Sequence, residues 1–326
     1  MVSKTKYAVS QDTIRALFHD AGLEPVASIA PLGAGEFNAV FAVTAGGREY
    51  ALKIAPTDDA PILAYEKGMM RAEVFWYEQM RAHTSIRVPE VYVTDFSRKR
   101  IPTDYFIMEK LPGKTLDQMG FSKTEKQRAA AEVAKMTAQL HKIKSDQFGY
   151  VQSGLYESWY LAIRASVEAL LGDCRKKSRR SRRGERLLRM IDRYRATLEK
   201  AECCMVSFDI WDPNIVCIPE GDGIQYAWID PERSFWGDRI LDFVCLEMMK
   251  PLAGKEATLA AYNAVAEQPI LATEEEKIRY AIAEGYLGLI METEKLYRYT
   301  PHHFGWWRNV AASAILYRSA FGALGK

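Results

Sequence analysis

The spacing of apolar residues changes along the chain, from short runs in the first third to longer helical periods in the remainder. Residues 24–54 contain successive short apolar runs that predict strands, and further strands are expected near residues 90–95 and 105–109. Residues 63–82 carry apolar side chains at helical spacing, and residues 10–22 have the start and stop signals of a helix. The first third should therefore form a small sheet with two helices.

The remaining two thirds are predicted to be mainly helical. Ser122 and Glu125 have the spacing of a capping box, which starts a helix that runs to about Lys142. Residues 215–229 contain two strand-like runs around a turn rich in Gly, Pro and Asp, which is typical of a β-hairpin. No internal repeat is evident. Further helices are expected near residues 156–172, 184–201, 239–250, 255–266, 273–297 and 304–322.

The composition is typical of a globular chain of two domains or lobes. The 326 residues are 48% apolar and 26% charged, and no apolar run approaches the length of a membrane span. The start of the chain lacks the apolar core of a signal peptide. The five cysteines have no metal-ligand spacing, and their odd number does not fit a disulfide framework. A reducing, cytoplasmic location is the simplest expectation.

The segment between residues 207 and 242 carries the candidate chemistry. Asp209 and Asn214 are five positions apart, and Asp230 follows the predicted hairpin. Phosphoryl transfer needs one carboxylate that orients or deprotonates the attacking hydroxyl, and it needs an amide oxygen and a second carboxylate that hold Mg²⁺. This spacing therefore predicts Asp209 as the catalytic base, with Asn214 and Asp230 as metal ligands. Asp and Asn are also ordinary turn residues, so only the combination is specific.

This segment resembles the aminoglycoside phosphotransferase and choline kinase group of small-molecule kinases. The pattern of that group is His-Gly-Asp, four residues, Asn, a hairpin, Ile-Asp, Trp-Gly-Asp and a further Asp. One departure is clear, since Ser207 stands where the group has the His that holds the loop in shape. The resemblance covers roughly residues 27–250. The matching residues here are Asp209, Asn214, Asp230, Trp236, Gly237, Asp238 and Asp242.

The resemblance implies an α+β, protein-kinase-like fold of two lobes. Residues 1–110 would form the small β-rich lobe that binds the nucleotide, and residues 111–326 the larger helical lobe with the catalytic loop. The hinge near residues 108–113 would bind adenine through its backbone, which leaves ATP and GTP as alternatives. The hinge residues assigned to this contact are Met108, Glu109 and Leu111.

A glycine-containing turn in the first lobe is the expected phosphate loop. Gly33 and Gly35 would let backbone amides approach phosphate oxygens, and Phe37 and Asn38 match residues common in the family's loop. Gly-x-Gly by itself is weak and often marks only a hairpin turn. Lys53 strengthens the assignment, because a lysine within an apolar strand needs anionic partners, which phosphates would supply.

A helix carboxylate should pair with Lys53. Glu73 is the choice from the family's spacing, with Glu66 and Glu78 as alternatives. Glu232, two residues beyond Asp230, is expected to steady a metal ion or its waters. Asp238, Asp242 and His141 are expected to have structural roles, the two aspartates as braces of the catalytic loop and the histidine at a helix end.

A run of basic residues is the least ordinary feature of the composition. Residues 175–189 hold nine basic residues and one acid, which gives +8 and leaves −6 for the rest of a chain whose total is +2. The simplest interpretation is an exposed, mobile loop between helices. A site for nucleic acid, anionic membrane or a phosphorylated substrate is the alternative, although the lack of interleaved aromatics makes nucleic acid unlikely.

The function implied is transfer of the γ-phosphoryl group of ATP or GTP to a hydroxyl of a small molecule. Antibiotic phosphorylation is what the resemblance suggests, while choline, homoserine and sugar kinases remain alternatives. Residues 292–299 and 302–307 could line the substrate site or simply pack the last helices. A pseudokinase that binds nucleotide to regulate a partner is a further alternative, for which Ser207 would be the sign of decay.

Overall fold

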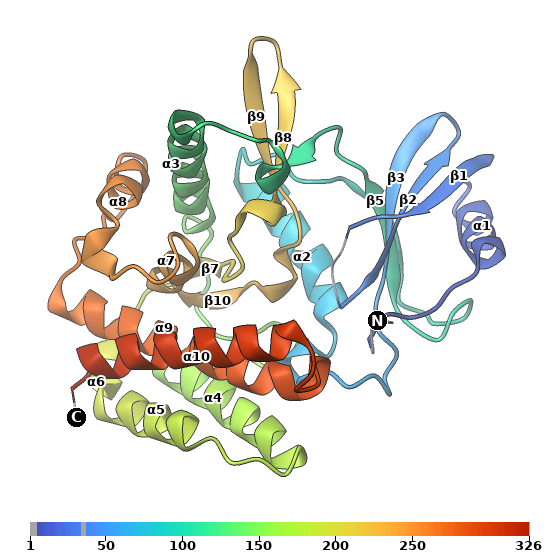
Figure 1. Ribbon diagram of the computed structural model, residues 1–326. Coiled ribbons are helices and arrows are strands. Elements are labelled where there is room, and N and C mark those ends of the chain that lie inside the picture. Colours follow the sequence, from blue (N-terminus) through green and yellow to red (C-terminus); the bar gives the residue numbers. More distant parts are fainter. Residues whose placement is uncertain (1–4, 34–36, 326) are drawn as a thin grey trace.

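A computed structural model describes residues 5–33 and 37–325 and has two lobes (Figure 1). The small lobe is built on an antiparallel sheet with the strand order β1-β2-β3-β5-β4. Strand β3 lies at its centre, and its run from Tyr50 to Ile54 is buried throughout, as its apolar sequence predicts. The elements of this lobe are α1 (Gln11–Asp20), β1 (Val26–Pro31), β2 (Ala39–Ala45), β3 (Arg48–Ile54), α2 (Met69–His83), β4 (Val91–Asp95) and β5 (Tyr105–Glu109).

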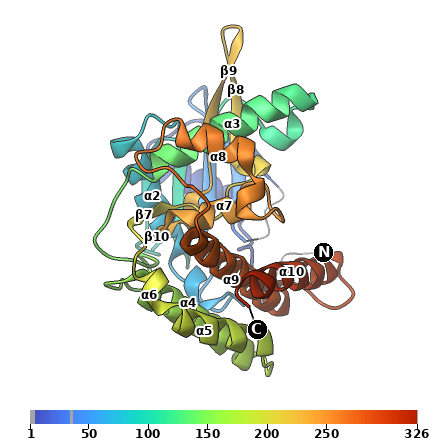
Figure 2. The ribbon, with the colours of Figure 1, turned by 90° about the vertical axis from the view of Figure 1, so that its left-hand side faces the viewer.

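The larger lobe is mainly helical, with the 25-residue helix α9 packed along α10 (Figure 1). Helix α9 is buried over most of its length, and its middle stretch from Tyr280 to Ile290 is apolar on nearly every side, as burial requires. Helices α4 and α5 lie side by side at the end of the molecule opposite the β8–β9 hairpin (Figure 2). The helices are α3 (Lys123–Leu140), α4 (Trp159–Lys176), α5 (Arg182–Arg193), α6 (Arg195–Leu198), α7 (Asp242–Cys245), α8 (Glu256–Asn263), α9 (Glu274–Arg298) and α10 (Phe304–Ala323).

Two small sheets fix the loops that carry the candidate chemistry. Strands β7 (Cys203–Val206) and β10 (Phe235–Asp238) pair antiparallel, and β7 leads directly into Ser207. Strands β8 (Ile215–Glu220) and β9 (Gly223–Trp228) form the predicted hairpin, which β6 (Lys114–Thr115) joins. The loops at 207–214 and 229–234 therefore both start and end in regular structure.

The apolar cores lie on both faces of the small lobe's sheet. One core packs α1 against the outer face, and the other joins α2 to the helical lobe. Trp76 of α2 meets Trp236 of β10 edge to face, with ring centroids 4.8 Å apart. The lobes thus share one apolar core, which fixes the position of α2 relative to the segment of residues 207–242.

Three predicted helices differ from the structure. The helix predicted for residues 63–82 begins at Met69, and Ala64–Glu66 forms a single 3₁₀ turn. The helix predicted for 184–201 is broken at Tyr194 into α5 and α6. The helix predicted for 239–250 was wrong over most of its length. Only Asp242–Cys245 is α-helical, because Glu247 and Met249 adopt a left-handed backbone conformation.

The basic run is largely helical, so its prediction as one loop was wrong. Helix α4 continues through Arg175 and Lys176, and α5 begins at Arg182, which leaves residues 177–181 as the connection. Ser181 is buried, caps α5 by accepting the amide N–H of Gly184, and donates to a carboxylate oxygen of Glu292. No helix in the described residues is long and apolar enough to cross a membrane.

Candidate active site

A buried carboxylate shapes the start of the catalytic loop. Oδ2 and Oδ1 of Asp242 accept the amide N–H groups of Ser207 and Phe208 at 3.1 and 2.6 Å. Asp242 Oδ2 also lies 3.0 Å from His141 Nε2, and His141 Nδ1 lies 2.7 Å from the hydroxyl of Tyr262. Asp242 is thus the expected brace, and His141 supports it. Asp238 differs from the expectation, because it lies 2.7 Å from Arg279 and caps the turn at Ile240 instead.

The loop departs from the family's pattern at two neighbouring positions. Ser207 is buried, and its hydroxyl has no hydrogen-bond partner among the described residues. Phe208, which stands where the pattern has Gly, adopts φ = +53°. Packing holds this strained backbone, since the Phe208 ring stacks on Tyr286 at 5.5 Å and meets Phe235 at 5.7 Å. Sequence reasoning found only Ser207, although the missing glycine was equally visible.

Asp209 and Asn214 face each other across this loop. Asn214 Nδ2 donates to the backbone oxygen of Asp209 at 3.0 Å and to its Oδ2 at 3.4 Å. The Asp209 side chain keeps 30% exposure, so a substrate can reach it. Burial raises the pKa of Asp209 to about 6, although the guanidinium of Arg233 pulls this pKa down. A carboxylate with this pKa is ionised near neutral pH and can accept a proton.

Lys53 lies at the centre of three carboxylates on the other side of the site. Its Nζ is 2.7 Å from Glu73, 2.5 Å from Asp230 and 3.1 Å from Glu232. Lys53 is 4% exposed and Glu73 is fully buried. Burial lowers the pKa of Lys53, but the carboxylates, Asp230 foremost, outweigh burial and hold this pKa well above its usual value. The pairing of Lys53 with Glu73 rather than Glu66 or Glu78 is confirmed.

Two described residues of the expected phosphate loop, Phe37 and Asn38, lie next to this cluster or to α9. Asn38 Nδ2 donates to Glu232 Oε2 at 2.7 Å, and Asn38 is buried. The ring of Phe37 lies 5.6 Å from the guanidinium carbon of Arg298, on the last turn of α9. Gly33 has φ = +73°, a conformation that favours glycine, whereas Gly35 lies outside the described residues.

The residues present suit a Mg²⁺ ion. One oxygen from each of Glu73, Asp230 and Glu232 lies within 4.8 Å of the others, and three carboxylates against one lysine leave a formal charge of −2. Asn38 Oδ1 is buried without a partner among the described residues, and Asn214 donates from Nδ2, which leaves its oxygen as a ligand. Mg²⁺ prefers such hard oxygen donors.

Comparison with known proteins agrees with this geometry. A profile described as the phosphotransferase enzyme family matches residues 28–277. The chain belongs to this family. A search of curated proteins finds no match.

Solved structures of small-molecule kinases share the fold at low sequence identity. A Ralstonia eutropha JMP134 protein assigned as an aminoglycoside phosphotransferase is 14% identical, with a TM-score of 0.65 over 96% of this chain and 98% of that one. A Haemophilus somnus 129PT protein assigned as a fructosamine-3-kinase is 19% identical, with a TM-score of 0.63 over 94% and 95%. A thermostable mutant of aminoglycoside phosphotransferase APH(4)-Ia, solved with ADP and hygromycin B, is 17% identical, with a TM-score of 0.61 over 95% and 97%.

The fold is therefore the α+β, kinase-like fold expected from the sequence, and the protein is a phosphotransferase with an alcohol group as acceptor. Nucleotide complexes among the related structures support nucleotide binding.

Met108 and Glu109 end β5 at the expected hinge, and Leu111 packs on the β8–β9 hairpin. The Glu109 amide donates to the carbonyl of Glu90, and its carboxylate pairs with Arg87, so both groups are already engaged. Gly113 is required, because a Cβ there would lie 2.4 Å from the carbonyl oxygen of Cys217.

Two residues of this phosphotransferase site were missed by sequence reasoning. The Tyr77 hydroxyl accepts the amide N–H of Asp230 at 2.9 Å, where Asp230 adopts φ = +63°. Arg233 lies between Asp209 and Glu294, 3.8 and 3.0 Å from their nearest oxygens. Tyr77 lies on an apolar stripe of its helix, which is typical of a core position, and no sequence motif marks Arg233.

The predicted substrate-lining stretch divides in the structure. Glu294 does reach the site through Arg233, whereas Glu292 binds Ser181 and Tyr317 on the far side of α9. Phe304 and Trp307 are exposed at 78% and 60%. These two aromatics therefore do not pack the last helices.

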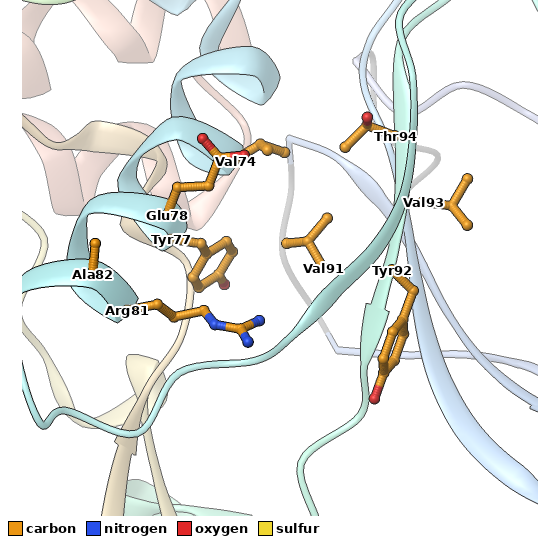
Figure 3. Close-up of a pocket in the computed structure, with 9 residues that line it drawn as sticks. All are labelled: Val74, Tyr77, Glu78, Arg81, Ala82, Val91, Tyr92, Val93 and Thr94. Atoms are coloured by element: carbon orange, nitrogen blue, oxygen red, sulfur yellow. The ribbon is translucent and has the colours of Figure 1, made fainter.

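A groove of about 470 Å³ lies on α2 beside the site (Figure 3). Its two walls are the exposed side of α2 and strand β4. None of the site residues predicted from the sequence lines it, but Tyr77 does, and Tyr77 also holds Asp230. The lining residues are Val74, Tyr77, Glu78, Arg81, Ala82, Val91, Tyr92, Val93 and Thr94.

Proposed function

We propose that this phosphotransferase transfers the γ-phosphoryl group of ATP to a hydroxyl of a small molecule, with GTP as the alternative donor. The observation that carries the proposal is that two groups from distant parts of the chain lie side by side, because the amide N–H of Ile229, next to Asp230, donates to the backbone oxygen of Asn214 at 2.9 Å. One is the Asp209–Asn214 pair on the catalytic loop, and the other is Lys53 with its carboxylates. These are the parts that phosphoryl transfer requires.

Asp209 acts on the substrate hydroxyl in this proposal. Its carboxylate accepts a hydrogen bond from the hydroxyl, orients the oxygen and takes the proton as the new bond forms. Asn214 fixes the direction of the carboxylate through its hydrogen bonds to Asp209. The brace from Asp242 to the amides of Ser207 and Phe208 keeps the loop in one conformation.

Lys53 and the phosphate loop hold the nucleotide in this proposal. Glu73 positions Lys53, and Gly33, Phe37 and Asn38 would place backbone amides near the phosphates. Asp230, Glu232 and Asn214 would hold Mg²⁺, which neutralises charge on the phosphate oxygens. Met108, Glu109 and Leu111 would contact the base at the junction of a nucleotide-binding lobe of residues 1–110 and a substrate-binding lobe of residues 111–326.

The substrate is proposed to be a small hydroxyl compound bound between the catalytic loop and α9. Related structures are named for aminoglycosides and fructosamine, so an antibiotic is one candidate. Sugars, homoserine and choline are the metabolic candidates. The proposal places the protein in the cytoplasm, where ATP and Mg²⁺ are available.

A coupled ADP assay across a panel of these alcohols tests the proposal. ADP release should depend on the acceptor, on Mg²⁺ and on Asp209. Slow hydrolysis with water as acceptor should also be measurable and should disappear in Asp209→Asn. A protein that binds Mg·ATP but leaves it intact with every acceptor and with water would contradict the proposal and favour a regulatory role.

A further inference from the structure

Two arginines neutralise the wall of the site next to the catalytic base. Arg233 donates to Glu294 Oε1 at 3.0 Å, and Arg298 Nη1 lies 2.8 Å from the same oxygen. Arg298 also pairs with Glu66, which is buried in the turn before α2. The four side chains are only 1–18% exposed. Two guanidinium groups therefore face two carboxylates in a largely buried cluster.

The carboxylate oxygens of Glu294 and Glu66, which form the acidic part of this wall, already have ion-pair or hydrogen-bond partners. Glu294 Oε1 binds both arginines, and its Oε2 accepts from Asn309 at 3.3 Å. Glu66 Oε2 accepts the amide N–H of Leu63 at 2.8 Å, and its Oε1 faces Arg298. An ammonium group of a substrate would have to displace a buried arginine to reach either carboxylate, and the arginine would then be left unpaired.

The electrostatics keep these carboxylates ionised and paired. Burial raises the pKa of Glu294, but Arg298 and Arg233 outweigh burial and hold this pKa below its usual value. The charged groups that act most strongly on Asp209 are Arg233, Asp230 and Glu294. The two arginines and the two glutamates of the wall thus cancel in charge, and the carboxylate of Asp209 is the charge that remains beside them.

One hydrogen-bonding group in the wall, on Arg233, remains free for an uncharged ligand. The Tyr65 hydroxyl also has no partner among the described residues, but it is itself buried and therefore not open to a ligand. The charges that act on this hydroxyl are those of Arg233, Glu66, Glu294 and Arg298, so it belongs to the same cluster. Arg233 Nε lies 3.8 Å from Asp209 Oδ2, beyond hydrogen-bond length, and can donate to a substrate oxygen.

We infer that the acceptor is an uncharged polyhydroxy compound, and that Arg233 and Arg298 exclude amine-rich acceptors by occupying Glu294 and Glu66. This inference rests on the proposed function and specifies its substrate class. Arg233 binds an oxygen next to the reacting hydroxyl, while Asp209 acts on the hydroxyl itself. The two arginines are then the residues that set acceptor specificity.

Matched pairs of acceptors test the inference. Each pair has one scaffold with and without amines: myo-inositol against 2-deoxystreptamine, and glucose against glucosamine, with kanamycin as a polycationic probe. The full chain is assayed for kcat/KM in the coupled ADP assay. Independently of turnover, the melting temperature of its Mg·ADP complex is measured with each compound at 0.15 M salt. The natural enzyme should show no preference for, and no stabilisation by, any amine.

Variants of the arginines should reverse this exclusion. Arg233→Gln and Arg298→Gln each leave a carboxylate short of a cation, so binding of 2-deoxystreptamine and kanamycin should strengthen by about tenfold or more. Arg233→Lys keeps the charge and should retain the natural preference. Arg279→Gln, a buried arginine paired with Asp238 instead, is the matched control and should not gain amine binding.

The outcomes separate the inference from the function on which it rests. Amine binding by the natural enzyme, or arginine variants that bind Mg·ADP but gain no amine affinity, would overturn the inference and leave the kinase assignment intact. Loss of the proposed function would appear differently, as natural protein with neither Mg·ATP binding nor ATP hydrolysis. Exclusion in the natural enzyme together with gain in both variants supports the inference.

Discussion

The nucleotide side and the acceptor side of the site manage charge in opposite ways. On the nucleotide side, Lys53 alone faces Glu73, Asp230 and Glu232, which leaves a formal −2. On the acceptor side, Arg233 and Arg298 match Glu66 and Glu294 one for one. The first cluster therefore has more carboxylates than cations, and burial raises the pKa of Glu73 to about 8, so this cluster can take up a proton or a further cation. The second cluster is already paired.

This difference indicates what each side is prepared to bind. Buried like charges are unfavourable unless they are paired, so an unbalanced cluster is stabilised by a metal ion or another cationic ligand. A balanced cluster gains nothing from a charged ligand and offers only hydrogen bonds. Mg²⁺ with the nucleotide fits the first side, and an uncharged acceptor fits the second. The predictions below test the two sides separately, from the largest expected effect to the smallest.

Asp209→Asn should lower kcat by about 10²–10⁴, because the base acts mainly in the transition state. Nucleotide affinity should change little, since Asp209 belongs to the acceptor side. Steady-state assays and a nucleotide titration measure the two quantities. Natural turnover by the variant would show that Asp209 is misassigned, and a parallel loss of nucleotide affinity would show that the two sides are not separate.

Asp230→Ala should remove most of the Mg²⁺-dependent stabilisation by ATP. A ligand at 100 times its Kd stabilises the natural fold by about 2.7 kcal/mol, which appears as a rise of several degrees in Tm. Thermal melts with ATP, with and without Mg²⁺, measure the effect. Arg298→Gln is the matched control from the acceptor side, since Arg298 pairs with Glu66 and Glu294, and it should keep the Mg²⁺ effect. Melts that respond to no nucleotide in the natural protein would refute the nucleotide side altogether.

Asp209→Asn should also stabilise the folded protein at pH 7.5, by about 1–2 kcal/mol after allowance for its partial exposure. The folded-state pKa of about 6 lies above the unfolded-state value of about 3.9, so the folded protein binds this proton more tightly. The stability that the proton contributes is present below pH 3.9 and is lost as pH rises through about 6. Denaturant melts at pH 4 and 7.5 should therefore show a gain only at the higher pH.

The same pKa predicts the acidic limb of the activity profile. The kcat/KM of the natural enzyme should rise with pH through about 6 and then level off, as Asp209 ionises. Arg233 lowers this pKa, so Arg233→Gln should move the limb to higher pH. A limb that does not move would mean that Arg233 does not act on the base.

Tyr77→Phe should weaken the Mg²⁺-dependent stabilisation by about 1–2 kcal/mol, because it leaves the amide N–H of Asp230 without its acceptor. Tyr92→Phe is the matched control, since Tyr92 lines the same groove and is 40% exposed. Melts with Mg·ATP distinguish the two variants. If Mg·ATP stabilised both variants equally, the Tyr77 hydroxyl would not support Asp230, and the Tyr77 side chain would contribute only packing.

Serine replacement of Arg175, Arg179 and Arg182 should have the smallest effect. These arginines are exposed, so kcat should be unchanged and stability should shift by no more than about 0.5 kcal/mol. The decisive measurement is KM across a salt series in natural and variant protein. A large, salt-sensitive rise in KM would mean that the basic run holds an anionic substrate, which would contradict an uncharged acceptor.

The sequence by itself determined the local part of the site. Asp209 and Asn214 lie on one loop, and Asp230 follows one hairpin, so their relation depends on short spacings that a motif can carry. The apolar run around Lys53 likewise predicted a buried lysine within a strand. The kinase-like fold was predicted from the family resemblance that these motifs carry.

Only the tertiary structure decided how the remaining charges pair. Glu66, Glu73 and Glu78 are three glutamates in one short stretch of sequence, where nothing in their type distinguishes them. In the structure, Glu66 pairs with Arg298, Glu73 pairs with Lys53, and Glu78 lines the groove on α2. Arg298 and Glu66 are 232 positions apart. The energy of a charge depends on burial and on distances of a few ångströms between elements, and neither is encoded in local periodicity. The neutral acceptor wall is therefore a property of the packed lobes.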